Sequence, residues 1–160
     1  MKRGEKAVLA LIGVVLVAGV IRSMLHVEGK HDRDIPFYTT ATREVAVKGM
    51  AIYNHNGCKE CHSLWTMKDI LESVPAPILD GIGSLRSETW LYDYLSSPNP
   101  QAVLPSRLKK RWSMPSYASM PDGDRRLLAQ YLASLKVKDW YLEQTKKAEY
   151  EKLTGKDYHK

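Results

Sequence analysis

The sequence is poor in cysteine: among its 160 residues only Cys58 and Cys61 carry a thiol. A structural zinc site needs about four cysteine or histidine ligands, and no second cysteine pair is present. A dithiol redox site of the thioredoxin kind needs a βαβ pattern, which is also missing. A disulfide between cysteines three apart closes a tight, strained ring. The common uses of a lone cysteine pair therefore fit this chain poorly.

Alternation of apolar and polar residues over a useful length is absent, and so are internal repeats. Apolar residues recur instead at helical spacing, which predicts an all-α chain. No nucleic-acid-binding motif is recognisable, although the formal net charge is +6. We therefore expect the positive charge to face an acidic partner protein or an anionic membrane surface, and we expect no nucleic-acid partner.

The N-terminal segment lacks polar side chains from Ala7 to Ile21, after three cations among its first six residues. A secretory signal would fit this pattern, but no good Ala-x-Ala cleavage site follows. A membrane-spanning helix needs roughly 20 residues, a length the segment reaches if it continues to residue 27. We favour an uncleaved membrane anchor over 1–27, with the secretory signal as the alternative. The cations would keep the N-terminus in the cytoplasm and place the rest of the chain in the periplasm, at the inner membrane.

The five residues Cys58-Lys59-Glu60-Cys61-His62 form the C-x-x-C-H pattern that is typical of covalent haem attachment. In that chemistry the two thiols add across the two vinyl groups of a haem, and the two intervening residues let one short helical turn span them. The adjacent histidine directs an imidazole nitrogen at the iron. A disulfide between the same cysteines would leave His62 without a role. The pattern therefore predicts one covalently bound haem c.

Composition divides the rest of the chain into three parts. Residues 28–41 are polar and contain a proline, which indicates a linker. Residues 42–136 contain the haem motif and the helical patterns, and we expect them to form one domain. Residues 137–160 form a charged C-terminal extension, for which we expect an extra helix and a loose end rather than part of the core. This extension either clamps a partner subunit or simply adds solubility.

Three helices are expected within the domain. One begins near Thr42, and a short one covers 87–95. The last begins between Ser119 and Asp122, two residues that have the spacing of a capping box.

An electron-transfer haem of the six-coordinate kind needs a ligand opposite His62, and a methionine there raises the reduction potential. The methionines after the motif are Met67, Met114 and Met120. Met67 is too close to His62 in sequence to reach the opposite face, and Met120 is expected to pack beneath the last helix. Met114 lies in a proline-marked loop that could fold over the ring, so we predict Met114 as the second iron ligand. The remaining histidines, His31, His55 and His159, are weaker candidates.

Together these motifs resemble the class I cytochromes c, over residues 42–136. In chain order they are the helix with Gly49 and Tyr53, Cys58-Lys59-Glu60-Cys61-His62, Pro77-Ile78-Leu79-Asp80-Gly81, Met114-Pro115, and the helix with Tyr131 and Leu132. The resemblance implies a class I cytochrome c fold, here with an N-terminal transmembrane helix. It also implies an electron-transfer protein rather than an enzyme.

The resemblance carries expectations for individual residues. The first and last helices of the domain should cross at a small residue, so that Gly49 abuts Tyr131. The carbonyl of Pro77 should accept the Nδ1 proton of His62, a bond that orients an iron-binding imidazole; Pro75 is the rival for this role.

Two further residues, Arg86 and Trp90, have positions suited to reaching a haem propionate or lining the ring. The alternatives are a solvated surface position for Arg86 and ordinary core packing for Trp90.

Two membrane-linked relatives look similar. Gly83-Ser84-Leu85-Arg86, Trp90-Leu91, Asn99-Pro100 and Met114-Pro115-Ser116-Tyr117 are similar to the single-haem subunit of C-family haem–copper oxidases. The short length with one anchor resembles the cytochrome c subunit of bacterial nitric oxide reductase. The implied role is to relay electrons to a catalytic membrane subunit of a respiratory complex, or as a free-standing carrier to a redox partner protein. The chain departs from the first relative in its shorter length and from both in its charged extension.

A basic cluster, Arg107, Lys109, Lys110 and Arg111, precedes Met114. It is either a docking face that attracts acidic partners or a solvated loop. A haem-based gas sensor or a peroxidase-like haem enzyme is the alternative function, and it would need an open or displaceable site opposite His62.

Overall fold

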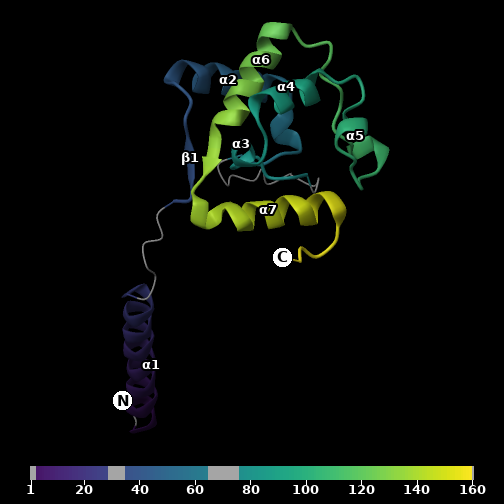
Figure 1. Cartoon of the computed structure of the whole chain (residues 1–160). Helices are drawn as coiled ribbons and strands as arrows, with labels where there is room; N and C mark the ends of the chain where they lie inside the picture. The colour runs from purple at the N-terminus through teal and green to yellow at the C-terminus, as the bar shows by residue number, and fades with distance from the viewer. Residues whose placement is uncertain (1–2, 29–34, 65–75, 160) are drawn as a thin grey trace. The chain divides into compact units, whose positions relative to one another are not determined.

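The computed structural model describes residues 3–28, 35–64 and 76–159. It divides into two compact units, Met1–Ile35 and Pro36–Lys160. The described part of the first unit is almost entirely one helix, and the second unit is a small helical domain (Figure 1).

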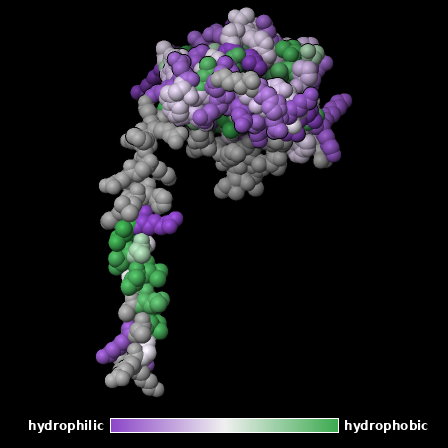
Figure 2. Space-filling model, turned by 60° about the horizontal axis from the view of Figure 1, so that its bottom comes forward, coloured by the Kyte–Doolittle hydropathy of each residue, from purple (hydrophilic) through white to green (hydrophobic). Residues whose placement is uncertain are grey.

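The first unit contains α1, a helix of 26 residues from Arg3 to Glu28. At about 1.5 Å per residue such a helix exceeds the roughly 30 Å of a bilayer's hydrocarbon core. Its segment Gly4–Arg22 has a mean hydropathy of 2.1, and its described large apolar side chains are exposed. Figure 2 shows hydrophobic residues along α1, whereas the visible face of the second unit is mostly hydrophilic. By length and composition α1 is able to cross a membrane.

The second unit is built on three helices, α2 (Arg43–His55), α4 (Glu88–Ser96) and α6 (Asp122–Ser134). Four single turns connect them: η1 (Cys58–Glu60), α3 (Ile82–Leu85), α5 (Pro100–Val103) and η2 (Lys110–Trp112). Tyr131 and Leu128 of α6 are among the most deeply buried side chains. The predicted all-α class is confirmed, and α6 is the helix against which the others pack.

The crossing of α2 and α6 occurs at Gly49, as the family resemblance implied. A Cβ placed on Gly49 would lie 2.3 Å from Cβ of Tyr131. That separation is far below van der Waals contact, so only a glycine lets the two helix backbones approach this closely.

A two-stranded antiparallel sheet was not expected. Strand β1 (Phe37–Thr39) lies in the predicted linker and pairs with β2 (Leu135–Val137), with Phe37 opposite Val137. Three-residue strands are too short to show an alternating pattern, so the sequence carries no signal for them. The pairing ties the entry of the domain to the end of α6.

The three predicted helix starts were right, and one predicted cap was wrong. Thr42 caps α2 by accepting a hydrogen bond from the amide of Val45. The expected capping box at Ser119 is absent, because Pro121 occupies the N-cap position of α6 and makes no side-chain cap.

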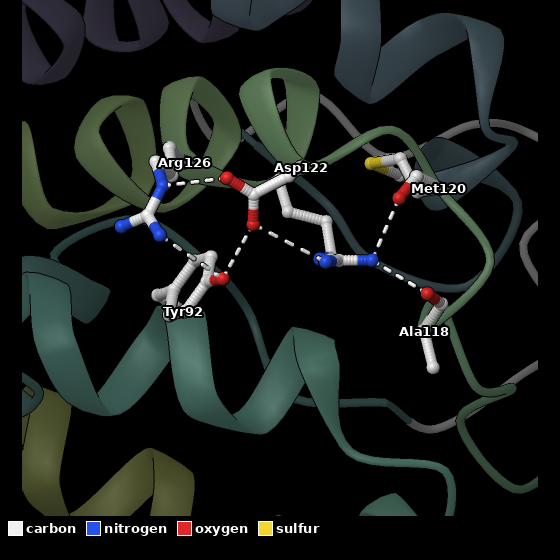
Figure 3. Close-up of polar contacts among 6 residues, drawn as sticks. Tyr92, Ala118, Met120, Asp122 and Arg126 are labelled. Atoms are coloured by element: carbon white, nitrogen blue, oxygen red, sulfur yellow. Dashed lines mark hydrogen bonds and ion pairs between the residues drawn. The ribbon is translucent and has the colours of Figure 1, made fainter.

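The carboxylate of Asp122 has other partners. It accepts hydrogen bonds from the hydroxyl of Tyr92 at 2.5 Å and from Nε of Arg126 at 2.7 Å, and it pairs with Arg125 at 3.3 Å (Figure 3). This network joins α4 to the start of α6.

The charged extension forms α7 (Asp139–Thr154), which runs along the bottom of this unit in Figure 1. Its first turn packs on the sheet, where the rings of Tyr141 and Phe37 meet edge-on with centroids 5.3 Å apart. Thr145 is buried. The predicted helix is present, and none of its residues belongs to the hydrophobic core cluster. It is nevertheless packed against its own domain through Tyr141.

We expect Gly49→Ala to destabilise the domain by about 1–3 kcal/mol, because the new methyl group would force α2 and α6 apart and overpack the crossing. The loss should exceed the gain of up to about 1 kcal/mol that alanine brings to a helix. Denaturant unfolding of the purified full-length chain measures it. Gly123→Ala on α6 is the control, since a Cβ there meets nothing within 4 Å; equal stability of the two variants would contradict the tight crossing.

Candidate haem-binding site

A mostly apolar cavity of about 260 Å³ opens beside the C-x-x-C-H motif. Each described helix and single turn of the second unit contributes at least one residue to its lining. Lining residues include Cys58, Cys61 and His62 of the motif, Pro77 and Ile82 after it, Trp90, Leu91, Tyr94 and Leu95 of α4, Gln101 of α5, Trp112 of η2, Met114 and Tyr117 of the following loop, Leu128 and Leu132 of α6, and Glu149 and Leu153 of α7. The cavity thus joins residues that are almost a hundred positions apart.

The motif itself is a single tight turn. Gly57 precedes it with φ of +68°, a left-handed conformation that suits glycine. The amides of Cys61 and His62 both donate to the carbonyl of Cys58, at 3.3 and 2.9 Å. The turn brings both cysteines and the histidine to one cavity, and neither thiol is in a disulfide.

The imidazole of His62 is oriented by Pro77. Its Nδ1 lies 2.7 Å from the carbonyl oxygen of Pro77. A carbonyl oxygen only accepts, so Nδ1 carries the proton and the neutral ring presents its lone pair at Nε2. The hydroxyl of Tyr53 donates to the carbonyl of His62 at 2.7 Å, which holds the backbone beneath the ring. The residue is therefore prepared to bind a metal through Nε2.

Cys58 is buried. Burial raises the pKa of its thiol above the ordinary value, despite the nearby Tyr117 hydroxyl. The pKa of Tyr117 is raised as well, chiefly by burial, and its hydroxyl donates to the carbonyl of Asn56 at 3.3 Å. An uncharged sulfur, such as that of a thioether, suits this environment.

Met114 lines the cavity and is half-buried, whereas Met120 is 8% exposed and belongs to the hydrophobic core. The loop between them is fixed at both ends. Ser116 donates to the carbonyl of Ser97 at 2.8 Å. Arg125 of α6 donates to the carbonyls of Ala118 and Met120 at 2.5 and 2.6 Å (Figure 3). Of the two methionines, only Met114 borders the cavity.

Arg86 and Trp90 lie together. The guanidinium carbon of Arg86 is 5.0 Å from the centre of the Trp90 ring, and Trp90 stacks on Tyr94 with centroids 5.1 Å apart. Trp90 lines the cavity. Arg86 is neither simply solvated nor directed at open space, because its Nη2 pairs with Oε2 of Glu149 at 3.0 Å.

Many of the residues that line this cavity were not predicted from the sequence, among them Gln101, Tyr117, Glu149 and Leu153. Tyr117 directly follows the Met-Pro-Ser run and was open to detection. Glu149 and Leu153 lie in a charged stretch whose composition gives no sign of a buried face. Gln101 lies in what the sequence presents as a proline-marked loop.

Several predicted candidates lie away from the cavity or outside the described residues. His55 and His159 are exposed. Arg107, Lys109 and Lys110 are also exposed, and the side chain of Arg111 is outside the described part. Met67, Pro75 and His31 fall outside the described residues as well. No cluster of three or more histidine, cysteine or acidic side chains suited to a metal ion occurs within 3–28, 35–64 and 76–159.

Comparison with known families gives one match: the cytochrome c family model covers residues 46–136, more than half of the chain. The matched segment runs from within α2 to β2 and leaves out α1 and α7. Neither a curated protein nor a solved structure matches the chain significantly.

The family match implies covalently attached haem c, and the residues of the cavity fit that group. Two thiols and an oriented imidazole share an apolar enclosure. The buried Nε2 of Gln101 has no hydrogen-bond partner among the described residues, and such a donor suits a haem propionate. The matched segment contains the haem motif, most of α2, all of α4 and α6, and the Met114 loop. The chain therefore belongs to the cytochrome c family, whose members transfer electrons through a covalently bound haem.

Proposed function

We propose that the protein is a membrane-anchored, single-haem cytochrome c that relays electrons at the periplasmic membrane face, to or within a respiratory oxidase or reductase complex. Haem c, when bound, supplies a one-electron couple. The protein's own residues hold that group, exclude water from it and present it to partners.

The observation that carries the proposal is that Met114 and His62 border the same apolar cavity. The imidazole of His62 and the thioether of Met114 would hold a haem iron between them and favour its reduced state. A carrier needs such a closed site, whereas a gas sensor or a peroxidase needs a vacant one. The bonds from Arg125 that fix the loop after Met114 support a stable rather than a displaceable ligand.

The membrane part of the proposal rests on α1. Its exposed apolar surface is the kind that a bilayer covers. Lys2, Arg3 and Lys6 favour a cytoplasmic N-terminus, which leaves the haem domain on the periplasmic side.

The contact with partners is proposed at the exposed residues before Met114. Lys109 and Lys110 are exposed, and Trp112 beside them is 42% exposed while it also lines the cavity. A cationic rim next to an aromatic side chain at the cavity edge suits an acidic docking partner. Arg107 contributes less, because its Nε is bound to the carbonyl of Lys152 at 3.0 Å.

Replacement of Met114 tests the axial ligand. We expect Met114→Ala to abolish the weak long-wavelength absorption band of an iron–thioether bond and to lower the reduction potential, because the thioether stabilises the ferrous state. Met120→Ala is the control and should retain the band. Loss of the band in Met120→Ala alone would overturn the assignment, and a five-coordinate wild-type iron that takes up added ligands would favour the sensor or enzyme.

Removal of two lysines tests the docking face. Lys109→Gln with Lys110→Gln should slow oxidation of the reduced protein by native membranes about threefold or more at low salt, and the difference should fade at high salt. Stopped-flow absorbance of the haem measures both rates. Lys48→Gln on α2 removes an exposed cation elsewhere, and an equal slowing by this control would show that only net charge matters.

Copurification tests the complex. From detergent-solubilised membranes we expect the protein to elute with the catalytic subunit of a haem–copper oxidase or of a nitric oxide reductase, identified by mass spectrometry. Elution alone would instead indicate a free-standing anchored carrier.

A further inference from the structure

The helix α7 lies outside the segment matched by the cytochrome c family, yet it forms one wall of the cavity. Tyr141 holds its start against β1. Arg107 holds its end by donating to the carbonyl of Lys152 at 3.0 Å. Glu149, which lies between these two attachments, and Leu153, which directly follows the second, line the cavity. A carboxylate is thereby added to a wall that is otherwise mostly apolar.

Glu149 differs from the other acidic residues of α7. Its side chain is 15% exposed, whereas those of Glu143 and Glu151 are 46% and 38% exposed. Burial raises the pKa of Glu149, and Arg86 opposes that rise without cancelling it. The charged form of Glu149 is therefore costly in this position, and a further negative charge nearby would shift it toward the protonated form.

The partner of Glu149 is held in place independently. Arg86 donates to the carbonyl of Leu85 at 3.0 Å and lies over the ring of Trp90, which itself lines the cavity. Because Arg86 follows α3 and Glu149 belongs to α7, the ion pair links the cytochrome core to the extension.

We propose that Glu149 is a redox-linked proton acceptor, which binds a proton from water when the cavity's haem takes up one electron and releases that proton on oxidation. The inference rests on the proposed electron-transfer function. Reduction adds one negative charge beside the carboxylate, so the affinity of Glu149 for a proton must rise in the reduced state. The electron comes from the donor and the proton from solvent, and oxidation returns both.

The linkage between electron uptake and proton binding by Glu149 determines how the reduction potential changes with pH. Below the pKa of Glu149 in the oxidised protein the carboxyl is protonated in both redox states, and the reduction potential is at its higher plateau. Between that pKa and the higher one of the reduced protein, the potential falls as pH rises. Above the second pKa the carboxylate is ionised in both states, and the potential is at its lower plateau.

Other ionisable groups surround the cavity and Glu149. Burial raises the pKa of Tyr94 and of Tyr117, so both phenols stay neutral in this range. The cysteines are used in haem attachment and His62 in ligation, and Glu60 is exposed. The described charged and titratable groups here are Glu60, Cys58, Cys61, His62, Tyr94 and Tyr117 at the cavity, Arg86 paired with Glu149, and Arg107 and Lys152 at the end of α7.

Spectroelectrochemical titration of the purified full-length protein at a series of pH values tests the proposal. In the wild type the reduction potential should fall in one step, from the higher to the lower plateau, as pH rises. The two plateaus should differ by about a tenfold change in the equilibrium constant for reduction, about 59 mV for one electron. Glu149→Gln should remove the step and stay near the higher plateau at every pH. Glu151→Gln, which makes the same charge change about 200° around the helix, should retain it. A step that persists in Glu149→Gln, or equal shifts in both variants, would overturn the proposal.

A second variant probes the cation. In Arg86→Gln the carboxyl loses its favourable charge, so the step should move to higher pH, and it should vanish in Arg86→Gln with Glu149→Gln. An unmoved step in Arg86→Gln would overturn the proposal. The long-wavelength iron–thioether band, recorded on the same samples, reports intact ligation, so failure of the proposed carrier function (no band in the wild type) is distinguished from failure of this inference (band present, no step).

Discussion

The close contact of α2 with α6 at Gly49 is the constraint on which the haem site depends. α2 leads directly into the C-x-x-C-H turn, and α6 supplies Leu128 and Leu132 to the cavity wall. If the two backbones were further apart, the motif would move away from that wall. Tyr131, packed on the glycine, is buried almost completely and also fills the centre of the core. The absence of a side chain at Gly49 thus sets the distance between α2 and α6.

The domain packs around this helix crossing but leaves a cavity that its own side chains do not fill. A small helical unit with a cavity of about 260 Å³ loses the contacts that the missing atoms would make. A covalently bound haem restores them, so the group serves packing as well as redox chemistry. The loops that complete the walls are held by specific hydrogen bonds, from Arg125, Ser116 and His62, instead of by extensive apolar burial.

The C-terminal helix changes the nature of one wall. The family model covers residues 46–136, which include the haem motif, the helices α4 and α6 and the Met114 loop. The helix α7 lies beyond that segment and adds to the cavity wall the carboxylate of Glu149, which is paired with Arg86. A partly buried ion pair gives modest stability, since desolvation offsets much of the attraction. Its position beside a redox centre makes it better suited to an electrostatic role than to holding the helix in place, a task met by Tyr141 and Arg107.

The sequence by itself determined the parts whose chemistry is local. Two thiols and an imidazole within five residues identify haem attachment, helical periodicity identifies α2, α4 and α6, and a proline-marked loop singles out Met114. The contact of His62 with Pro77 and that of Gly49 with Tyr131 were accessible only through family resemblance. Tertiary structure alone decided the pairing of β1 with β2, the replacement of the expected cap at Ser119 by the Asp122 network, and the entry of Glu149 into the cavity wall. Each of these depends on which distant residues become neighbours, and short strands or a charged helix carry no periodic signal that reveals their partners.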